Sequence, residues 1–279
     1  MRSCTILALL LAVAAPAAVA TAQDAAQITL VSAGSGHREP LRHRFEAGQT
    51  QAMRLRVQSQ MRTLLGEQEQ TIPMPIMRMD MDFGPTTITD SGNLRYAYEI
   101  TDVGVTGGEN EQLNQRVLTS ITQLIGTHGE TEIDDRGNMV DFTYELPEGA
   151  PEGLQQQERL LRDSMSQVLP RFPAEPVGEG ASWVVRSDLN LPNMQVAVAT
   201  TYELRSRSGD HIELHVSTDT VEDAPNPADI DVRGSGRIRF VIGTLQTRGR
   251  VQTVAAARIR GPRGEMSMRI RTRMQVTPR

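Results

Sequence analysis

Hydrophobic and polar residues alternate along most of the chain. Between residues 51 and 61, the apolar residues Met53, Leu55 and Val57 are separated by polar ones. The same alternation returns at Met77, Met79, Met81 and Phe83, at Leu94, Tyr96, Tyr98 and Ile100, at Val140, Phe142 and Tyr144, and at Val196, Val198, Tyr202 and Leu204. A period of two is typical of strands that bury one face and expose the other. The pattern therefore predicts a mainly β protein.

Short segments that contain glycine separate these runs and predict hairpin turns. They read TDSGN before Leu94, DDRGN before Met139, RSGD before His211 and GPRG between Ile259 and Met266. Asp, Asn and Gly favour the tight turns that join neighbouring antiparallel strands. No composition shift divides the chain, so we expect one β-rich domain over residues 40–279, built as an antiparallel meander.

Two segments break the alternation and predict amphipathic helices near residues 109–126 and 153–169. In both, apolar residues recur at three- and four-residue intervals, and Gly126 and Pro170 follow as stop signals. Each helix needs an apolar surface to cover, and the sheet is the only candidate. The expected fold class is mainly β (α+β), a strongly curved antiparallel sheet or half-barrel meander with two amphipathic helices packed on it.

The C-terminal strands allow a register to be predicted. A hairpin at GPRG sets Ile259 opposite Met266, Ala257 opposite Met268 and Ala255 opposite Ile270. If QTRG at residues 246–249 forms the preceding turn, Phe240 lies opposite Ala255 and Ile238 opposite Ala257. Large and small apolar residues then face each other across three strands, as good packing requires.

The other face of these strands gathers arginine. From Arg237 to Arg279 there are eleven arginines against one acid, Glu265, whereas residues 23–236 carry 17 arginines against 33 acids. The expected arginine face consists of Arg237, Arg239, Arg258, Arg260, Arg269, Arg271 and Arg273. We interpret it either as a solvated outer face balanced by acids elsewhere, or as a contact for an anionic membrane surface or an envelope protein.

The first 22 residues read as a secretory signal peptide. One arginine precedes an apolar stretch of about a dozen residues, and small residues follow, with expected cleavage after Ala20 or Ala22. The only cysteine, Cys4, precedes the apolar stretch, so we expect no lipoprotein and no thiol in the mature chain. We therefore expect a periplasmic or secreted protein with an N-terminal segment over residues 23–39.

Methionine replaces the usual Leu, Val and aromatic residues at many positions expected to face inward. The candidate lining residues are Met53, Met77, Met79, Met81, Met266, Met268 and Met274. Methionine is flexible and fills irregular space. Three interpretations follow, namely a plain core, the wall of a cavity for an apolar ligand, and a thioether site for copper(I).

Other chemistry finds little support in the sequence. HIELH, residues 211–215, lacks the His-Glu-x-x-His order of zinc proteases and alternates as a strand does, which separates its two histidines by roughly 13 Å. There is no Gly-x-Ser-x-Gly elbow and no phosphate-binding glycine loop. With one Trp and four Tyr, the chain has few aromatic residues to stack on bases. We expect no enzyme activity, no cofactor, no metal ion and no nucleic acid partner.

The stretch FPAEPVGEGASW, between a predicted helix and a predicted strand, carries a resemblance to a family. Its Pro173, Pro176, Val177, Gly180 and Trp183 match an L-P-x-x-P-V-x-x-G-x-x-W pattern. In this respect the chain resembles a family of exported bacterial proteins of unknown function, in which the pattern introduces the second half. At the level of the fold it is also similar to the LolA and LolB lipoprotein carriers, whose curved sheet and helices surround an apolar cavity.

These expectations combine into a hypothesis about function. The chain is expected to be an exported, non-catalytic binding protein that encloses an apolar, lipid-like ligand. The alternatives are a structural or assembly partner at the cell envelope with no small ligand, and a methionine-based copper(I) carrier.

Overall fold

The computed structural model describes residues 27–65, 68–108, 110–148, 169–191, 194–221, 230–261 and 264–279. Within these ranges the protein is mainly β, and its paired strands are antiparallel. This confirms the mainly β, antiparallel class that the alternation predicts. The same ranges contain one helix, α2 (Glu111–Thr122).

The strands are mostly long, and several reach 15 residues. In chain order they are β1 (Ile28–Ser32), β2 (Ser35–Glu39), β3 (Gln51–Leu65), β4 (Gln68–Pro73), β5 (Ile76–Ile88), β6 (Leu94–Thr106), β7 (His128–Ile133), β8 (Met139–Phe142), β9 (Val177–Glu179), β10 (Ser182–Leu191), β11 (Met194–Ser208), β12 (His211–Thr220), β13 (Ile230–Val241), β14 (Thr247–Gly261) and β15 (Gly264–Pro278).

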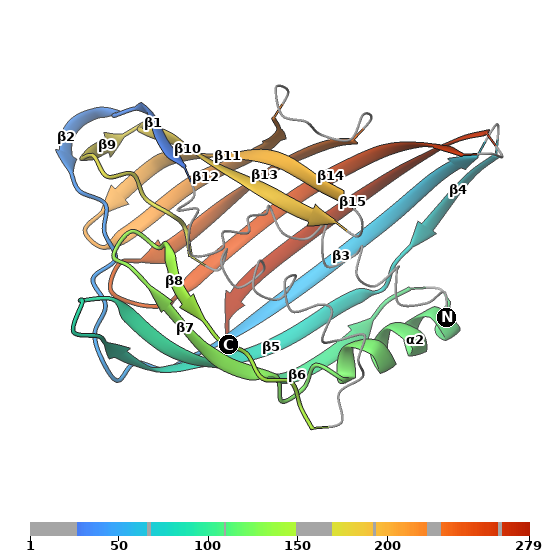
Figure 1. The fold of residues 1–279 in the computed structure, drawn as a ribbon, viewed down its shortest axis with the longest axis horizontal. Coiled ribbons are helices and arrows are strands. Elements are labelled where there is room, and N and C mark those ends of the chain that lie inside the picture. The colour runs from blue at the N-terminus through green and yellow to red at the C-terminus, as the bar shows by residue number, and fades with distance from the viewer. Residues whose placement is uncertain are drawn as a thin grey trace.

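Thirteen of these strands form one open sheet. Their order is β1-β10-β11-β12-β13-β14-β15-β3-β5-β6-β7-β8, with β4 paired to β3, while β2 and β9 form a separate two-stranded sheet. Most neighbours follow each other in the chain, as in a meander. Two pairings join distant segments: β15 lies beside β3, and β1 lies beside β10 (Figure 1). The segment over residues 23–39 thus contributes strands to both sheets.

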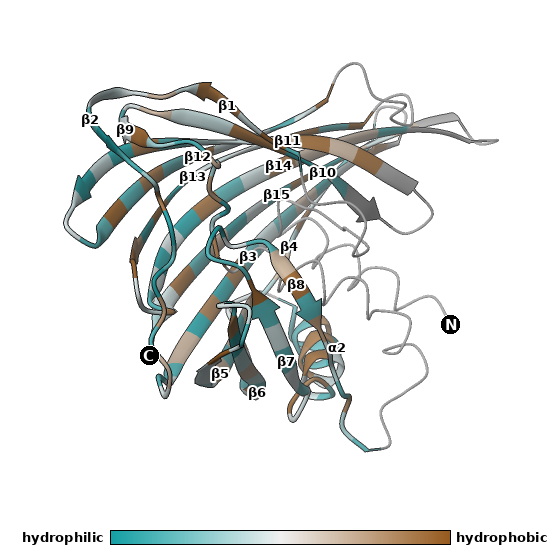
Figure 2. Ribbon diagram, turned by 60° about the vertical axis from the view of Figure 1, so that its left-hand side comes forward, coloured by the Kyte–Doolittle hydropathy of each residue, from teal (hydrophilic) through white to brown (hydrophobic). Residues whose placement is uncertain are grey.

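The alternation of the sequence matches the burial of the side chains. In β12, for example, Ile212, Leu214 and Val216 are buried, and His211, Glu213 and His215 face the other side. Bands of high and low hydropathy alternate along the long strands in Figure 2. The four predicted glycine-containing turns are confirmed, since each lies between two strands that pair with each other.

The register of the last three strands is partly as predicted. The β14–β15 pairs Ala255–Ile270, Ala257–Met268 and Ile259–Met266 are confirmed. The β13–β14 register was predicted wrongly, because the turn spans residues 242–246 rather than 246–249. Phe240 therefore lies opposite Thr247, and Ile238 lies opposite Gly249. The partner of each β13 residue moves by eight positions, an even number, so the same side chains still face inward.

Helix α2 forms within the first expected helical segment. The side chain of Asn110 caps it by accepting a hydrogen bond from the Leu113 backbone N–H at 3.0 Å. Val117 and Ile121 are buried on one stripe, and the helix packs against β6. The second expected helix, residues 153–169, lies outside the described residues except for Leu169.

Two main hydrophobic clusters lie on the face of the sheet that α2 covers. One joins β3, β5 and β6 to α2, and includes Met53, Phe83 and Ile121. The other surrounds Trp183 of β10, which is fully buried. Residues Phe172, Val177 and Ala181 of the FPAEPVGEGASW stretch belong to this second cluster, and Gly180 has a left-handed backbone with φ of 77°. The stretch therefore has a packing role.

The described residues contain no helix that is both long enough and apolar enough to cross a membrane.

Candidate functional site

The face of the sheet that carries α2, called the inner face from here on, holds every candidate lining methionine. Register places Met53 opposite Met81, and β15 residues Met268 and Met274 opposite Thr63 and Val57 of β3. Met53, Met77 and Met81 are only 4–9% exposed and pack in the cluster with α2. These three therefore fill core space.

The remaining candidate methionines are half-buried and lie in two places. Met79 and Met274 pack against the edge of the cluster that contains α2. Met266 and Met268 lie at the other end of β15, eight and six residues before Met274, so the structure does not bring all seven together. Around Met268 the inner face carries further half-buried apolar residues, namely Met61, Ile230, Ala255 and Ala257.

A row of hydroxyl groups crosses the inner face from β11 to β3. Register aligns Thr200, Thr218, Gly234, Thr253, Thr272 and Ser59 across six neighbouring strands. The hydroxyls are buried, and they pair in part, with Thr200 Oγ1 and Thr218 Oγ1 at 3.2 Å and Ser59 Oγ and Thr272 Oγ1 at 3.1 Å. A buried polar row of this kind needs partners, which the paired hydroxyls supply to each other.

The opposite, outer face carries the predicted arginines. Arg237, Arg239, Arg258, Arg269, Arg271 and Arg273 are exposed there, while the side chain of Arg260 lies outside the described residues. Arg237 and Arg239 share Glu213 of β12, with N–O distances of 3.0 and 2.7 Å. The acids of β12 therefore balance part of the face, as the solvated-face interpretation expects.

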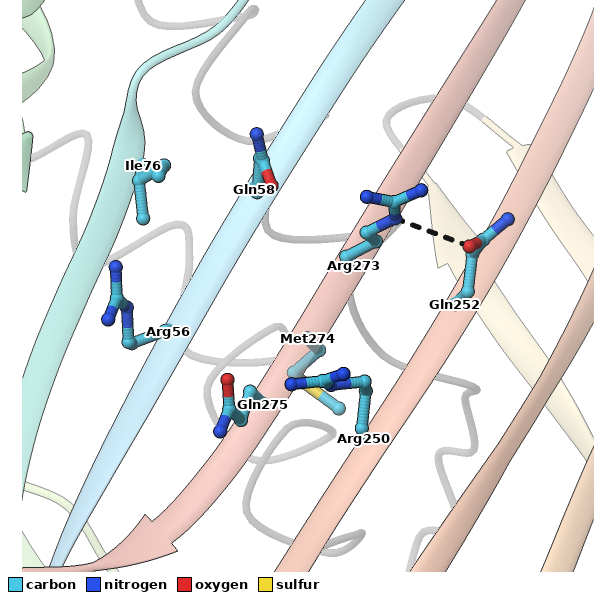
Figure 3. Close-up of a pocket in the computed structure, with 8 residues that line it drawn as sticks. All are labelled: Arg56, Gln58, Ile76, Arg250, Gln252, Arg273, Met274 and Gln275. Atoms are coloured by element: carbon cyan, nitrogen blue, oxygen red, sulfur yellow. Dashed lines mark hydrogen bonds between the residues drawn. The ribbon is translucent and has the colours of Figure 1, made fainter. Parts of the chain in front are cut away.

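A groove of about 480 Å³ lies on this face over β3, β14 and β15. Figure 3 shows its lining: Arg56, Gln58, Ile76, Arg250, Gln252, Arg273, Met274 and Gln275. Across the strands, Arg56 lies opposite Gln275, which lies opposite Arg250, and the next row runs Gln58, Arg273, Gln252. Glutamines therefore separate the arginines within this Arg–Gln array, but on the outer sides Arg250 lies opposite Arg237 and Arg56 lies opposite Arg78.

Most arginines of β14, β15 and β3 on this face lack a carboxylate partner. Within the described part of the chain, Arg56, Arg248, Arg250, Arg258, Arg269, Arg271 and Arg273 form no ion pair. Arg273 Nε instead donates to Gln252 Oε1 at 3.3 Å. Exposed cations at this density attract anions from solution, and a planar guanidinium binds carboxylate and phosphate groups through two hydrogen bonds.

Sequence reasoning missed several members of this face. The alternation of β14 places Arg248 and Arg250 on the outer face, but only once the turn is located at residues 242–246. Arg56 carries no such local signal, because the pairing of β3 with β15 joins segments about two hundred residues apart.

The histidines and the glutamate of HIELH are not gathered into a metal-holding group in the described ranges. No group of three or more His, Asp or Glu residues there is placed to hold a metal ion. His211, Glu213 and His215 lie on strand β12, and Glu213 is engaged by two arginines.

A scan against protein-family models and a search of curated proteins both find no match for this chain.

Proposed function

We propose that this chain is an exported, non-catalytic binding protein that carries an apolar, lipid-like ligand on the inner face of its sheet. In this proposal the sheet curves around its helical cover, as in the LolA and LolB carriers that the chain resembles at the level of the fold. The ligand lies beyond the packed methionines, over the central strands β13, β14, β15 and β3.

One observation supports the proposal most directly: beyond the buried hydroxyl row, at the end of these strands near Met268, part of the inner face is apolar but only half-buried. Met61, Met266, Met268, Ala255 and Ala257 each keep part of their surface exposed, whereas Met53 and Met81 at the helix end are packed. Exposed apolar surface on a sheet favours binding an apolar partner, at about 25 cal/mol per Å² removed from water.

The proposal is tested by native mass spectrometry of the full chain purified after expression with export, compared with the denatured protein. A mass excess that is lost on denaturation is expected. Ala257→Phe should reduce it, because the ring fills the inner face. Ala256→Phe, on the outer face of the same strand, is the matched control and should retain the ligand. If the wild-type protein has no excess mass and binds no added hexadecanoate, the carrier proposal is overturned. The alternative of a structural or assembly partner at the cell envelope then takes its place.

A second proposal concerns the outer face. We propose that the arginines of β3, β14 and β15 dock the protein on an anionic membrane surface. Their lack of carboxylate partners supports this, since each arginine near an anionic bilayer contributes about 1 kcal/mol. The Arg–Gln array is open to solvent and lies on the face away from the proposed ligand.

Vesicle sedimentation tests this docking. The triple variant Arg56→Gln, Arg250→Gln, Arg273→Gln should bind phosphatidylglycerol vesicles at least about tenfold more weakly than wild type at low salt. The matched control removes three exposed arginines elsewhere, Arg38→Gln, Arg186→Gln and Arg205→Gln, and should bind as wild type does. Equal losses in both triple variants would mean that total charge, and not this face, controls binding.

A further inference from the structure

The segment Leu169–Phe172 crosses between the two hydrophobic clusters of the inner face. Leu169 packs in the cluster with α2, and Phe172 packs in the cluster with Trp183. Its backbone is held firmly: Trp183 Nε1 donates to the Arg171 carbonyl at 2.7 Å, and Phe172 N donates to the Arg136 carbonyl at 2.9 Å. The position of Arg171 between these residues is thus fixed by the fold.

Arg171 is a buried cation whose side chain has no bonding partner among the described residues. The residue is 8% exposed, and its guanidinium makes no hydrogen bond or ion pair within the described protein. A buried charge without a partner is costly, so natural proteins rarely keep one unless a ligand uses it.

Asp134, the acid whose charge acts on Arg171, has its carboxylate occupied by other groups. Asp134 acts on Arg171 through its charge only, and its carboxylate accepts hydrogen bonds from Arg136 N, Asn138 N and Asn138 Nδ2 at 2.8–2.9 Å. Burial lowers the pKa of Arg171, and the charges of Tyr202 and Asp134 oppose that shift. An arginine stays protonated in proteins even so.

Tyr202 supplies a second free polar group beside Arg171. Its ring stacks on Trp183 at 5.7 Å between centroids, on the inner face of β11. Its hydroxyl makes no hydrogen bond within the described protein. Burial raises the pKa of this phenol, so it remains a hydrogen-bond donor at neutral pH.

We infer that Arg171 and Tyr202 form an anion-binding site that holds the carboxylate or phosphate head of an acyl ligand on the inner face. The inference rests on the proposed function, in which the acyl chain of the ligand lies over the central strands. It adds the place where the head group of that ligand binds. Guanidinium and phenol supply several donors to an anion that aromatic rings shield from water, and charged hydrogen bonds are stronger there than in water. The ligand class is therefore an acyl chain with an anionic head.

The single tryptophan of the chain, Trp183, reports on this site, because it stacks on Tyr202. The full chain is titrated with hexadecanoate, 1-hexadecanol or acetate while Trp183 fluorescence is followed. Hexadecanoate should bind at least about tenfold more tightly than hexadecanol. Arg171→Gln should remove this preference and Tyr202→Phe should reduce it. Arg186→Gln, an exposed arginine on the outer face of β10, should keep it.

The outcomes separate the two proposals. Equal affinity of the wild type for hexadecanoate and hexadecanol would overturn the anion site and leave the carrier in place. Acetate binding that Arg171→Gln abolishes, with no binding of either long-chain probe, would keep the site and overturn the carrier. If hexadecanoate, hexadecanol and acetate all fail to bind, both the anion site and the carrier proposal are overturned. Should Arg171→Gln fail to fold in urea titrations, Tyr202→Phe decides, and an unchanged preference in that variant would overturn the site.

Discussion

Asp80 illustrates how much a single carboxylate can organise. The alternation places it on a polar strand face, yet its side chain is 2% exposed. Arg54 holds it through two hydrogen bonds of 2.7 and 2.8 Å, and Arg78 and Arg279 bind the same carboxylate at 2.6 and 3.2 Å. This contact ties the last residue of the chain to β3 and β5. No periodicity predicts it, because the arginines come from three separate segments.

The cluster around Asp80 makes stability depend on acid pH. The hydrogen bonds from Arg54 dominate in lowering the pKa of Asp80 from 3.8 to about 2. Because the pKa of Asp80 is lower in the folded than in the unfolded state, the ionised carboxylate stabilises the fold. This contribution is fully present above pH 3.8 and is lost as the pH falls towards 2. In urea titrations, Asp80→Asn should lose about 2 kcal/mol at pH 7 and show a flatter decline below pH 4. Asp82→Asn, at a half-exposed acid that also binds Arg279, should change stability little.

Strands β13 and β14 show which parts of a sheet a sequence predicts. Alternation fixes which side chains share a face, because a register error of an even number of residues preserves the faces. It does not fix the partner, since the turn at residues 242–246 lacks the tight two-residue signal present at GPRG. The faces of Phe240 and Ile238 were therefore predicted correctly and their partners wrongly. The hydroxyl row depends on register across six strands, so it could not be predicted.

Close approach of the same two strands makes a glycine necessary. A Cβ at Gly236 of β13 would collide with the Arg250 carbonyl oxygen and lie 2.8 Å from Val251 Cα. Gly236→Ala should therefore destabilise the fold by about 2 kcal/mol, through a forced backbone shift. Gly249→Ala on β14 is the matched control, because its Cβ would meet the nearest atom at 3.4 Å. Chemical denaturation of both variants checks this, and similar losses would contradict a local clash.

The arginines of the outer face are a property of the assembled molecule. Sequence analysis could find Arg258, Arg269 and Arg271 because they alternate within two adjacent strands. It could not find Arg56, whose strand joins them through a long-range pairing. It also missed Arg171, which lies in an irregular segment without periodicity and is buried without a bonding partner in the described part of the chain.

The density of unpaired arginines should make stability respond to salt. Repulsion among Arg56, Arg250, Arg273 and their neighbours is screened when the Debye length falls from about 30 Å at 0.01 M salt to about 8 Å at 0.15 M. Added NaCl should therefore stabilise the wild type more than the variant with glutamine at these three positions, by about 0.5–1 kcal/mol. Thermal unfolding at the two concentrations measures the difference. An equal response in both proteins would show that the repulsion is negligible.

The pairing of β15 with β3 has a consequence for biosynthesis. A chain made from its N-terminus completes β3 early, but the strand that covers one edge of β3 leaves the ribosome only some two hundred residues later. Until residues 264–278 arrive, that edge keeps its backbone N–H and C=O groups without strand partners and can pair with other chains. Loop closure over some two hundred residues also slows folding. We therefore expect the growing or translocating chain to be prone to aggregation until β15 is available to pair with β3.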